Sequence, residues 1–211
     1  MTTLTIRKSR SRQGTLAALN DSLGKYAVSD GDHVVATGHI HLLRGGTSRG
    51  EMEIEAGSRK LTASVSYRGK YVDAAKVTDD RTGDTVVAGR RLSGNRQSQE
   101  WAVTLRDGRT IGWIYRMAEH KLGFFDSDGS LIMSHGHDAS FELPQKKTST
   151  FRILLRFWSA AVASAARFVV TVDDEKARQV VDTEDIPVLA LLGMWLELNA
   201  EADDPASTGP S

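Results

Sequence analysis

Eleven consecutive residues near the C-terminus, 186–196, carry no charge and no hydrogen-bonding side chain apart from the indole of Trp195. A helix of this length rises about 1.5 Å per residue and spans roughly 16 Å, whereas a bilayer span needs ~20 residues. Apolar side chains such as Leu189, Leu192 and Met194 cover all sides of this segment, so it has no face suited to water. We therefore expect a helix that is enclosed by the rest of its own fold.

The chain before this segment has the pattern of an all-β domain. Between residues 32 and 143, short runs of β-branched, aromatic and other apolar residues alternate with Gly, Asp and Ser at intervals of about ten residues, which is typical of a sandwich or a barrel. Turns such as Asp107-Gly108 and Asp128-Gly129 predict tight antiparallel hairpins, because Gly tolerates positive φ and Asp hydrogen-bonds the turn backbone. The expected strands are residues 34–43, 51–56, 61–67, 71–78, 85–92, 101–105, 110–116, 122–125, 131–134 and 140–143.

The segment that follows is harder to assign, because the first half of residues 150–172 fits both a strand and a helix period. We expect a strand over 150–157, a short Ala-rich helix over 159–166 and a last strand over 168–172. The final helix is predicted to begin near Thr183, an acceptable N-cap, and to end near Asn199.

The termini differ in composition from the body of the chain. Residues 1–30 read as a basic N-terminal arm with a short helix over 16–23, whose apolar positions recur at helical spacing. Residues 200–211 are acidic and rich in Pro, Ser, Thr and Gly, so we expect a disordered tail. The domain between them is expected to cover residues 31–199, with the core helix at 183–199.

Composition restricts the setting and the chemistry. The chain contains no cysteine, which excludes disulfides, thiol nucleophiles and zinc-thiolate sites and favours a cytoplasmic protein. Residues 1–13 lack the apolar core of a secretory signal, and we expect neither export nor a transmembrane segment. The formal net charge is zero, but ten acidic and two basic residues from Asp173 onward leave residues 1–172 at about +8.

The order of strands, Asp/Gly hairpins and apolar final helix resembles the tubby C-terminal-like superfamily, which includes tubby, phospholipid scramblases and LURP-one-related proteins. The resemblance covers roughly residues 32–199 and implies a mainly β fold, a closed antiparallel barrel of about 10–12 strands that encloses a hydrophobic C-terminal helix. Three segments carry it: the strand Tyr71-Val72-Asp73-Ala74-Ala75-Lys76-Val77, the hairpin Phe124-Phe125-Asp126-Ser127-Asp128-Gly129, and the helix at residues 185–198.

The resemblance also implies a class of partner, because tubby-type members bind phosphoinositide headgroups through basic side chains on the barrel surface. We therefore expect a noncatalytic module, without a cofactor, that binds anionic phospholipid at the cytoplasmic membrane surface or binds a protein partner. Basic residues near Phe151, Phe157 and Trp158 suit such docking, although charged residues more often lie on a solvated face. The candidate residues for the headgroup are Lys146, Lys147, Arg152 and Arg156, with Arg90 and Arg91 as a second group.

Two His-x-His pairs give an alternative function. On strands, His39 and His41 would share one face, and so would His135 and His137. If the two pairs converged with Glu51 or Glu53, they would form a nitrogen and carboxylate site for zinc, iron or nickel, as in a small metal-dependent enzyme. Two unrelated polar strand faces are the simpler interpretation.

A second alternative is nucleic-acid binding through the N-terminal arm. Residues 7–12 read Arg-Lys-Ser-Arg-Ser-Arg and would neutralise several phosphates. The arm lacks aromatic residues for stacking on bases, so a solvated leader is the preferred interpretation.

Overall fold

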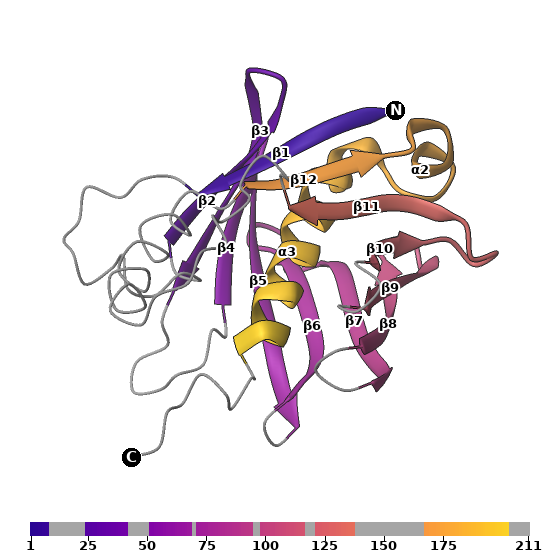
Figure 1. The fold of residues 1–211 in the computed structure, drawn as a ribbon. Coiled ribbons are helices and arrows are strands. Elements are labelled where there is room, and N and C mark those ends of the chain that lie inside the picture. The colour runs from indigo at the N-terminus through magenta and orange to yellow at the C-terminus, as the bar shows by residue number, and fades with distance from the viewer. Residues whose placement is uncertain are drawn as a thin grey trace, which may run out of the picture.

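The computed structural model describes residues 1–8, 24–41, 51–68, 71–94, 98–116, 121–137 and 167–202. Within these ranges twelve strands pair antiparallel in sequence order, and the pairing of the first strand with the twelfth closes a barrel (Figure 1). The strands are β1 (Thr2–Lys8), β2 (Gly24–Asp30), β3 (His33–His41), β4 (Glu51–Ala56), β5 (Arg59–Arg68), β6 (Tyr71–Asp79), β7 (Thr85–Gly94), β8 (Ser98–Leu105), β9 (Thr110–Arg116), β10 (Lys121–Phe125), β11 (Leu131–His137) and β12 (Arg167–Val172).

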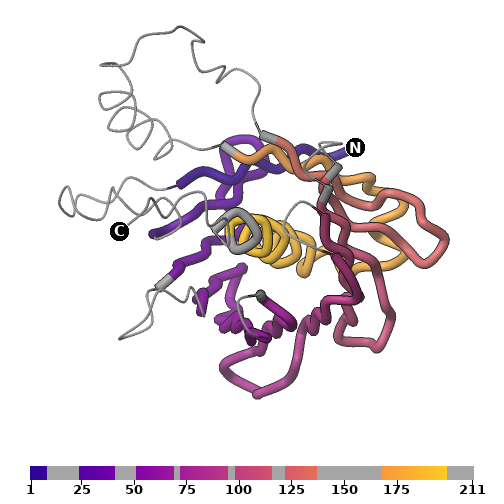
Figure 2. Tube along the Cα trace, turned by 60° about the horizontal axis from the view of Figure 1, so that its bottom comes forward, coloured from indigo at the N-terminus to yellow at the C-terminus, as the bar shows by residue number. Residues whose placement is uncertain are grey.

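Three helical segments follow the last strand. They are α2 (Asp174–Val180), the 3-10 turn η3 (Thr183–Asp185) and α3 (Ile186–Ala202). Figure 2 shows α3 in the middle of the ring of strands. The predicted fold class, a closed antiparallel barrel with an enclosed C-terminal helix, is therefore confirmed.

The strands form because apolar and polar residues alternate along them. In β4, Met52, Ile54 and Ala56 are buried, whereas the glutamates between them are exposed. A period of two places one set of side chains inside the barrel and the other in solvent. The inner set then packs against α3.

The helix α3 is buried on every side, as its sequence predicts. Residues 188–197 are all buried, and burial of each large apolar side chain contributes ~1.5–3 kcal/mol to stability. Two glycines let helix and wall approach closely. A Cβ on Gly38 of β3 would lie 3.1 Å from a Leu191 methyl carbon, and a Cβ on Gly193 of α3 would lie 2.6 Å from Cε1 of His135.

Short hairpin turns join the strands at the end of the barrel where α3 begins, which we call the turn end. In the turn between β10 and β11, Oδ1 of Asp126 accepts hydrogen bonds from the amides of Asp128 (3.0 Å) and Ser130 (2.7 Å). Gly129 supplies the positive φ of 79° that this turn needs. The Asp/Gly hairpins predicted from sequence are therefore confirmed here. The opposite end, where α3 finishes, is called the helix-exit end.

The structure differs from the sequence analysis at the N-terminus. Two barrel strands, β1 and β2, lie where we predicted a basic arm, and Leu4 and Ile6 of β1 are buried in the core. Only two inward residues of β1 are apolar and its outward residues are Thr and basic residues, so its alternation is weak in the sequence. The predicted helix over 16–23 lies outside the described residues.

The C-terminal part also differs in detail. Thr183 is the first residue of η3 and not the N-cap of a long helix, and α3 continues to Ala202, which includes three residues of the expected tail. The helix α2 was not predicted. The predicted strands at 140–143 and 150–157 and the predicted helix at 159–166 lie outside the described residues, as do residues 203–211 of the tail.

Candidate functional site

The two histidine pairs do not converge. His39 is half-buried on the outer wall of β3, because its neighbours Gly38 and Ile40 face the core. His135 lies inside the wall of β11, where it is 5% exposed and its ring centroid is 6.0 Å from that of Phe124. The wall of the barrel therefore separates these two imidazoles. Of the second members, His41 pairs with Glu51 and His137 pairs with Phe168.

The outer wall of β2–β5 carries an open groove of about 290 Å³. The small residues Thr37, Gly38 and Thr62 form part of its lining. The rim combines both charges: it is formed by Lys25, His39, Glu53, Glu55, Lys60 and Asp80. Among the described side chains, no group of three or more His, Asp or Glu residues is arranged to hold a metal ion.

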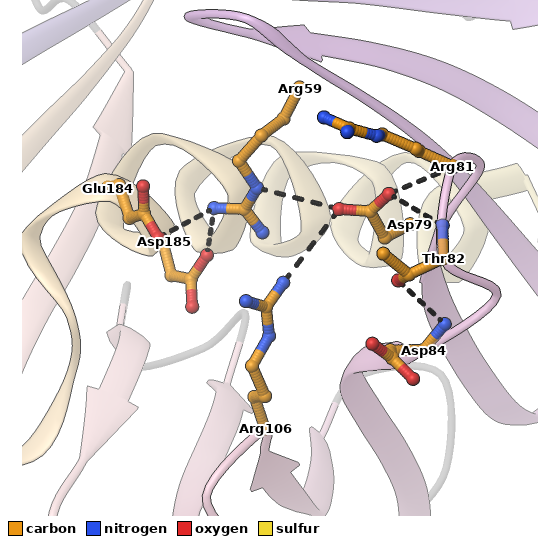
Figure 3. A network of polar contacts seen from close by, with 8 residues as sticks. All are labelled: Arg59, Asp79, Arg81, Thr82, Asp84, Arg106, Glu184 and Asp185. Atoms are coloured by element: carbon orange, nitrogen blue, oxygen red, sulfur yellow. Dashed lines mark hydrogen bonds and ion pairs between the residues drawn. The ribbon is translucent and has the colours of Figure 1, made fainter.

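An ionic network anchors α3 at the turn end (Figure 3). The Nη1 atom of Arg59 donates to Oδ1 of Asp185 at 2.7 Å, and it lies 3.6 Å from Oε1 of Glu184. On its other side, Nε of Arg59 lies 4.0 Å from Oδ2 of Asp79, and Nη2 of Arg106 lies at the same distance from that oxygen. Because Asp185 immediately precedes α3, the network ties the start of the helix to three hairpin turns. Its role is structural.

The turn between β8 and β9 carries a carboxylate with an altered pKa. The backbone amide of Arg109 donates to Oδ1 of Asp107 at 2.9 Å, and this hydrogen bond is the main cause that lowers the pKa of Asp107 below its usual value. The Arg109 guanidinium, which bridges to the same carboxylate, lowers the pKa further. The residue is exposed in a hairpin turn, so the shift reflects turn formation.

The remaining candidate surface lies at the helix-exit end, on the wall formed by β5, β6 and β7. Large apolar side chains are exposed there, since Tyr67 is 39% and Leu92 is 65% exposed. Arg68 follows Tyr67 directly, and Arg90 precedes Leu92 by two residues; both cations are exposed. The Nη2 atom of Arg91 donates to the carbonyl oxygen of Gly94 at 2.6 Å, which fixes this cation near the end of β7. We call these five residues, Tyr67, Arg68, Arg90, Arg91 and Leu92, the β5–β7 rim.

Strand pairing places the parts of the β5–β7 rim close together. Tyr67 pairs with Val72 of β6, and Ala74 of β6 pairs with Arg90. Arg90 and Leu92 are two residues apart and share one face of β7, whereas Arg91 between them pairs with the buried Trp101 on the other face. The rim therefore gathers apolar and cationic side chains at one end of three adjacent strands, with Arg90 and Leu92 on the outer face.

The turn end of the barrel is strongly acidic. Its segments contain fifteen acidic and seven basic residues, whereas the other described residues include ten basic and six acidic ones. These turn-end segments are residues 30–33, 55–60, 79–85, 105–110, 125–131 and 173–185. The acidic character of the turn end is a feature that sequence position alone did not reveal.

The predicted headgroup residues are only partly described. Arg90 and Arg91 belong to the β5–β7 rim. Lys146, Lys147, Arg152 and Arg156 lie outside the described residues. The segment that contains them leaves β11 at His137 and enters β12 at Arg167, and both of these residues are at the helix-exit end. Sequence reasoning missed Tyr67 and Leu92, because apolar residues in strands are expected to be buried.

No family model, no curated protein and no solved structure matches this chain. In the part of the chain that the structure describes, no helix is long and apolar enough to cross a membrane.

Proposed function

We propose that this protein is a noncatalytic binding module that docks on membrane surfaces containing anionic phospholipid. The β5–β7 rim is the observation that carries this proposal, because it combines exposed apolar side chains with exposed arginines at the less acidic end of the barrel. Peripheral proteins use this combination: apolar side chains enter the headgroup region while cations pair with lipid phosphates.

The filled interior supports a surface function. The helix α3 occupies the centre of the barrel, and its side chains pack against the inward residues of the strands. Among the described residues, the side chains that face inward therefore contact α3, which favours ligand binding at the outer wall or the rim.

The acidic charge of the turn end favours one orientation. Near an anionic surface each cation contributes ~1 kcal/mol, and each carboxylate is repelled to a similar extent. The acidic turn end is therefore directed away from the membrane, with the axis of α3 close to the membrane normal. Lys146, Lys147, Arg152 and Arg156 lie outside the described residues, between β11 and β12 in the sequence, and we propose them as further headgroup contacts. The resemblance to the tubby-like superfamily supports the same class of ligand.

The test is vesicle flotation with two matched charge-reversal variants. The rim variant is Arg68→Glu with Arg90→Glu, and the control is Arg81→Glu with Arg178→Glu, whose exposed cations lie at the turn end. Both variants change the net charge by the same amount. We expect wild-type protein and the control to float with vesicles of phosphatidylcholine and phosphatidylserine, and the rim variant to bind at least about 30-fold more weakly, since two lost cations correspond to ~2 kcal/mol.

A second matched pair of variants tests whether apolar side chains of the rim insert into the membrane. Leu92→Ser should weaken binding, whereas Leu131→Ser, at a 41% exposed leucine of the turn end, should not. Binding should fall as salt is raised and should be absent with phosphatidylcholine alone. Equal loss in the rim and control variants, or no flotation of wild-type protein at low salt, would refute the proposal.

A further inference from the structure

Two exposed leucines lie at opposite ends of the barrel. Leu92, near the end of β7, is 65% exposed, and Leu131, the first residue of β11 at the turn end, is 41% exposed. Single exposed apolar side chains are common on protein surfaces, so the two leucines alone define no site. What distinguishes them is that the charged side chains beside each leucine have one sign, and that the two signs are opposite.

The charge beside Leu92 is positive. Arg90 shares the outer face of β7 with Leu92, and Arg68 is the last residue of β5, two strands away. Both side chains are exposed, and neither makes an ion pair or a side-chain hydrogen bond in the part of the chain that the structure describes. These two cations are therefore available to an anionic partner.

The charge beside Leu131 is negative. Asp128 lies in the turn of the same β10–β11 hairpin and is exposed. The amide of Asp173 donates to the carbonyl oxygen of Ile132 at 2.9 Å, so the first turn of α2, which carries the exposed Glu175, begins beside Leu131. Among the described residues, the carboxylates of Asp128 and Glu175 have no ion-pair partner. We call Asp128, Leu131 and Glu175 the Leu131 patch.

We propose that copies of this chain associate head to tail, with the β5–β7 rim of one copy on the Leu131 patch of the next. Leu92 then packs against Leu131, and the two arginines face the two carboxylates. Complementary charge selects this contact, since two rims or two Leu131 patches would place like charges opposite each other. The nearest opposing cation, Lys176, is already directed at Asp173, with Nζ 3.7 Å from Oδ2.

The position of the two surfaces determines the kind of assembly. They lie at opposite ends of one closed barrel, so they cannot meet within a single molecule. Each added copy leaves one rim and one Leu131 patch unoccupied, and such heterologous contacts give open chains or rings rather than twofold dimers. The average mass should therefore rise continuously with concentration. A contact built on so few residues belongs to the weak class below about 1,200 Å², so it should be measurable at about 0.1–1 mM protein.

Sedimentation velocity of the full-length protein, at low salt and without lipid, tests the contact. The rim variant is Arg68→Glu with Arg90→Glu, and the patch variant is Asp128→Lys with Glu175→Lys. Each variant alone should remain monomeric at concentrations at which the wild-type protein associates. The dissociation constant should rise at least about tenfold, because like charges then face each other across the contact.

Mixing the two variants is the decisive measurement. The reversed rim is acidic and the reversed patch is basic, so each variant again complements the other. An equimolar mixture should therefore associate at concentrations at which each variant alone is monomeric. A matched control for the rim variant is Lys25→Glu with Lys60→Glu, two exposed cations on the outer wall of β2 and β5, which should associate as the wild-type protein does.

Four outcomes would overturn the proposal. They are a wild-type protein that stays monomeric at about 1 mM in low salt, a mass that stops at that of a dimer, a mixture of the two variants that does not associate, and a control that loses association as the rim variant does. The contact does not depend on membrane docking, because the measurement contains no lipid. The patch variant should still float with anionic vesicles, so failure of self-association and failure of membrane binding are separate results.

Discussion

Replacing Gly193 by alanine is the sharpest test of how the helix packs inside the barrel. The new Cβ would lie 2.6 Å from Cε1 and 2.8 Å from Nε2 of His135, and 3.1 Å from Cε2 of Phe124. Cβ atoms do not approach other heavy atoms this closely, so the ring, the helix or the strand has to shift. Both rings are buried, which leaves them little room to move.

Two opposing effects set the size of the change in stability that Gly193→Ala causes. Alanine is preferred over glycine inside a helix by ~1 kcal/mol, whereas overpacking a filled core costs ~1–3 kcal/mol. Because the contacts at Gly193 are far inside normal distances, we take the upper part of that range, and the net destabilisation of Gly193→Ala is ~1–2 kcal/mol.

The effect of Gly193→Ala on the free energy of unfolding should change sign when the His135 ring is absent. In a His135→Ala background, the closest two contacts of the new Cβ disappear, so that Gly193→Ala should stabilise the protein by ~1 kcal/mol through helix propensity. The coupling between the two substitutions is then ~2–3 kcal/mol, which is large for a contacting pair. The assay is urea unfolding of the four proteins of the cycle, with unchanged m-values as the criterion for comparison.

Gly136→Ala is the matched control, since a Cβ at this exposed neighbour of His135 would meet only the carbonyl oxygen of Val169, at 4.0 Å. It should have a small effect in both backgrounds. If Gly193→Ala has the same sign and size with and without the His135 ring, the contact does not exist as described and the reasoning fails.

Two further predictions concern the turn end. Arg59→Met should lower the free energy of unfolding by ~2–3 kcal/mol, because it leaves Asp185, 7% exposed, without its partner; the cost is reduced from the ~3–5 kcal/mol of a fully buried pair since Arg59 is 15% exposed. Arg81→Met, at an exposed arginine, should change stability little in the same urea assay, and equal effects would contradict the role of the network. Carboxyl-carbon NMR should find the pKa of Asp107 below its usual value and restored in Arg109→Pro, which removes the main donor. The pKa is lowered on folding, so this carboxylate contributes stability above the pKa of the unfolded chain and loses it as pH falls through the lower pKa of the folded state.

Much of the barrel could be predicted from the sequence because charge marks its outer face. The strands β4 and β9 have the bounds that were predicted, and in β4 glutamates alternate strictly with Met52, Ile54 and Ala56. Such a strand admits only one orientation. In β1, threonines occupy most outward positions, and threonine occurs on both faces of sheets. The sequence pattern of this segment therefore could not distinguish a barrel strand from a solvated N-terminal arm.

The functional surfaces depended on information that sequence spacing does not contain. The two His-x-His pairs look alike, yet His39 faces out and His135 faces in, because the side is set by the register of each strand with its neighbours. Flanking residues held a partial signal: Ile40 beside His39 takes the inward position. The exposure of Tyr67 and Leu92 depends on how the barrel ends, which no local pattern specifies.

Closure of the barrel has a consequence for how the chain reaches its fold. The register that joins Leu4 to Val170 connects the first strand to the last, and α3 follows only after that last strand. During synthesis, eleven strands therefore leave the ribosome before the barrel can close, and the helix that fills its interior emerges afterwards. Until then the inner faces of the strands are exposed to water and to other chains. Contacts so distant in sequence form slowly, which makes this a protein whose yield should depend on chaperones and on growth temperature.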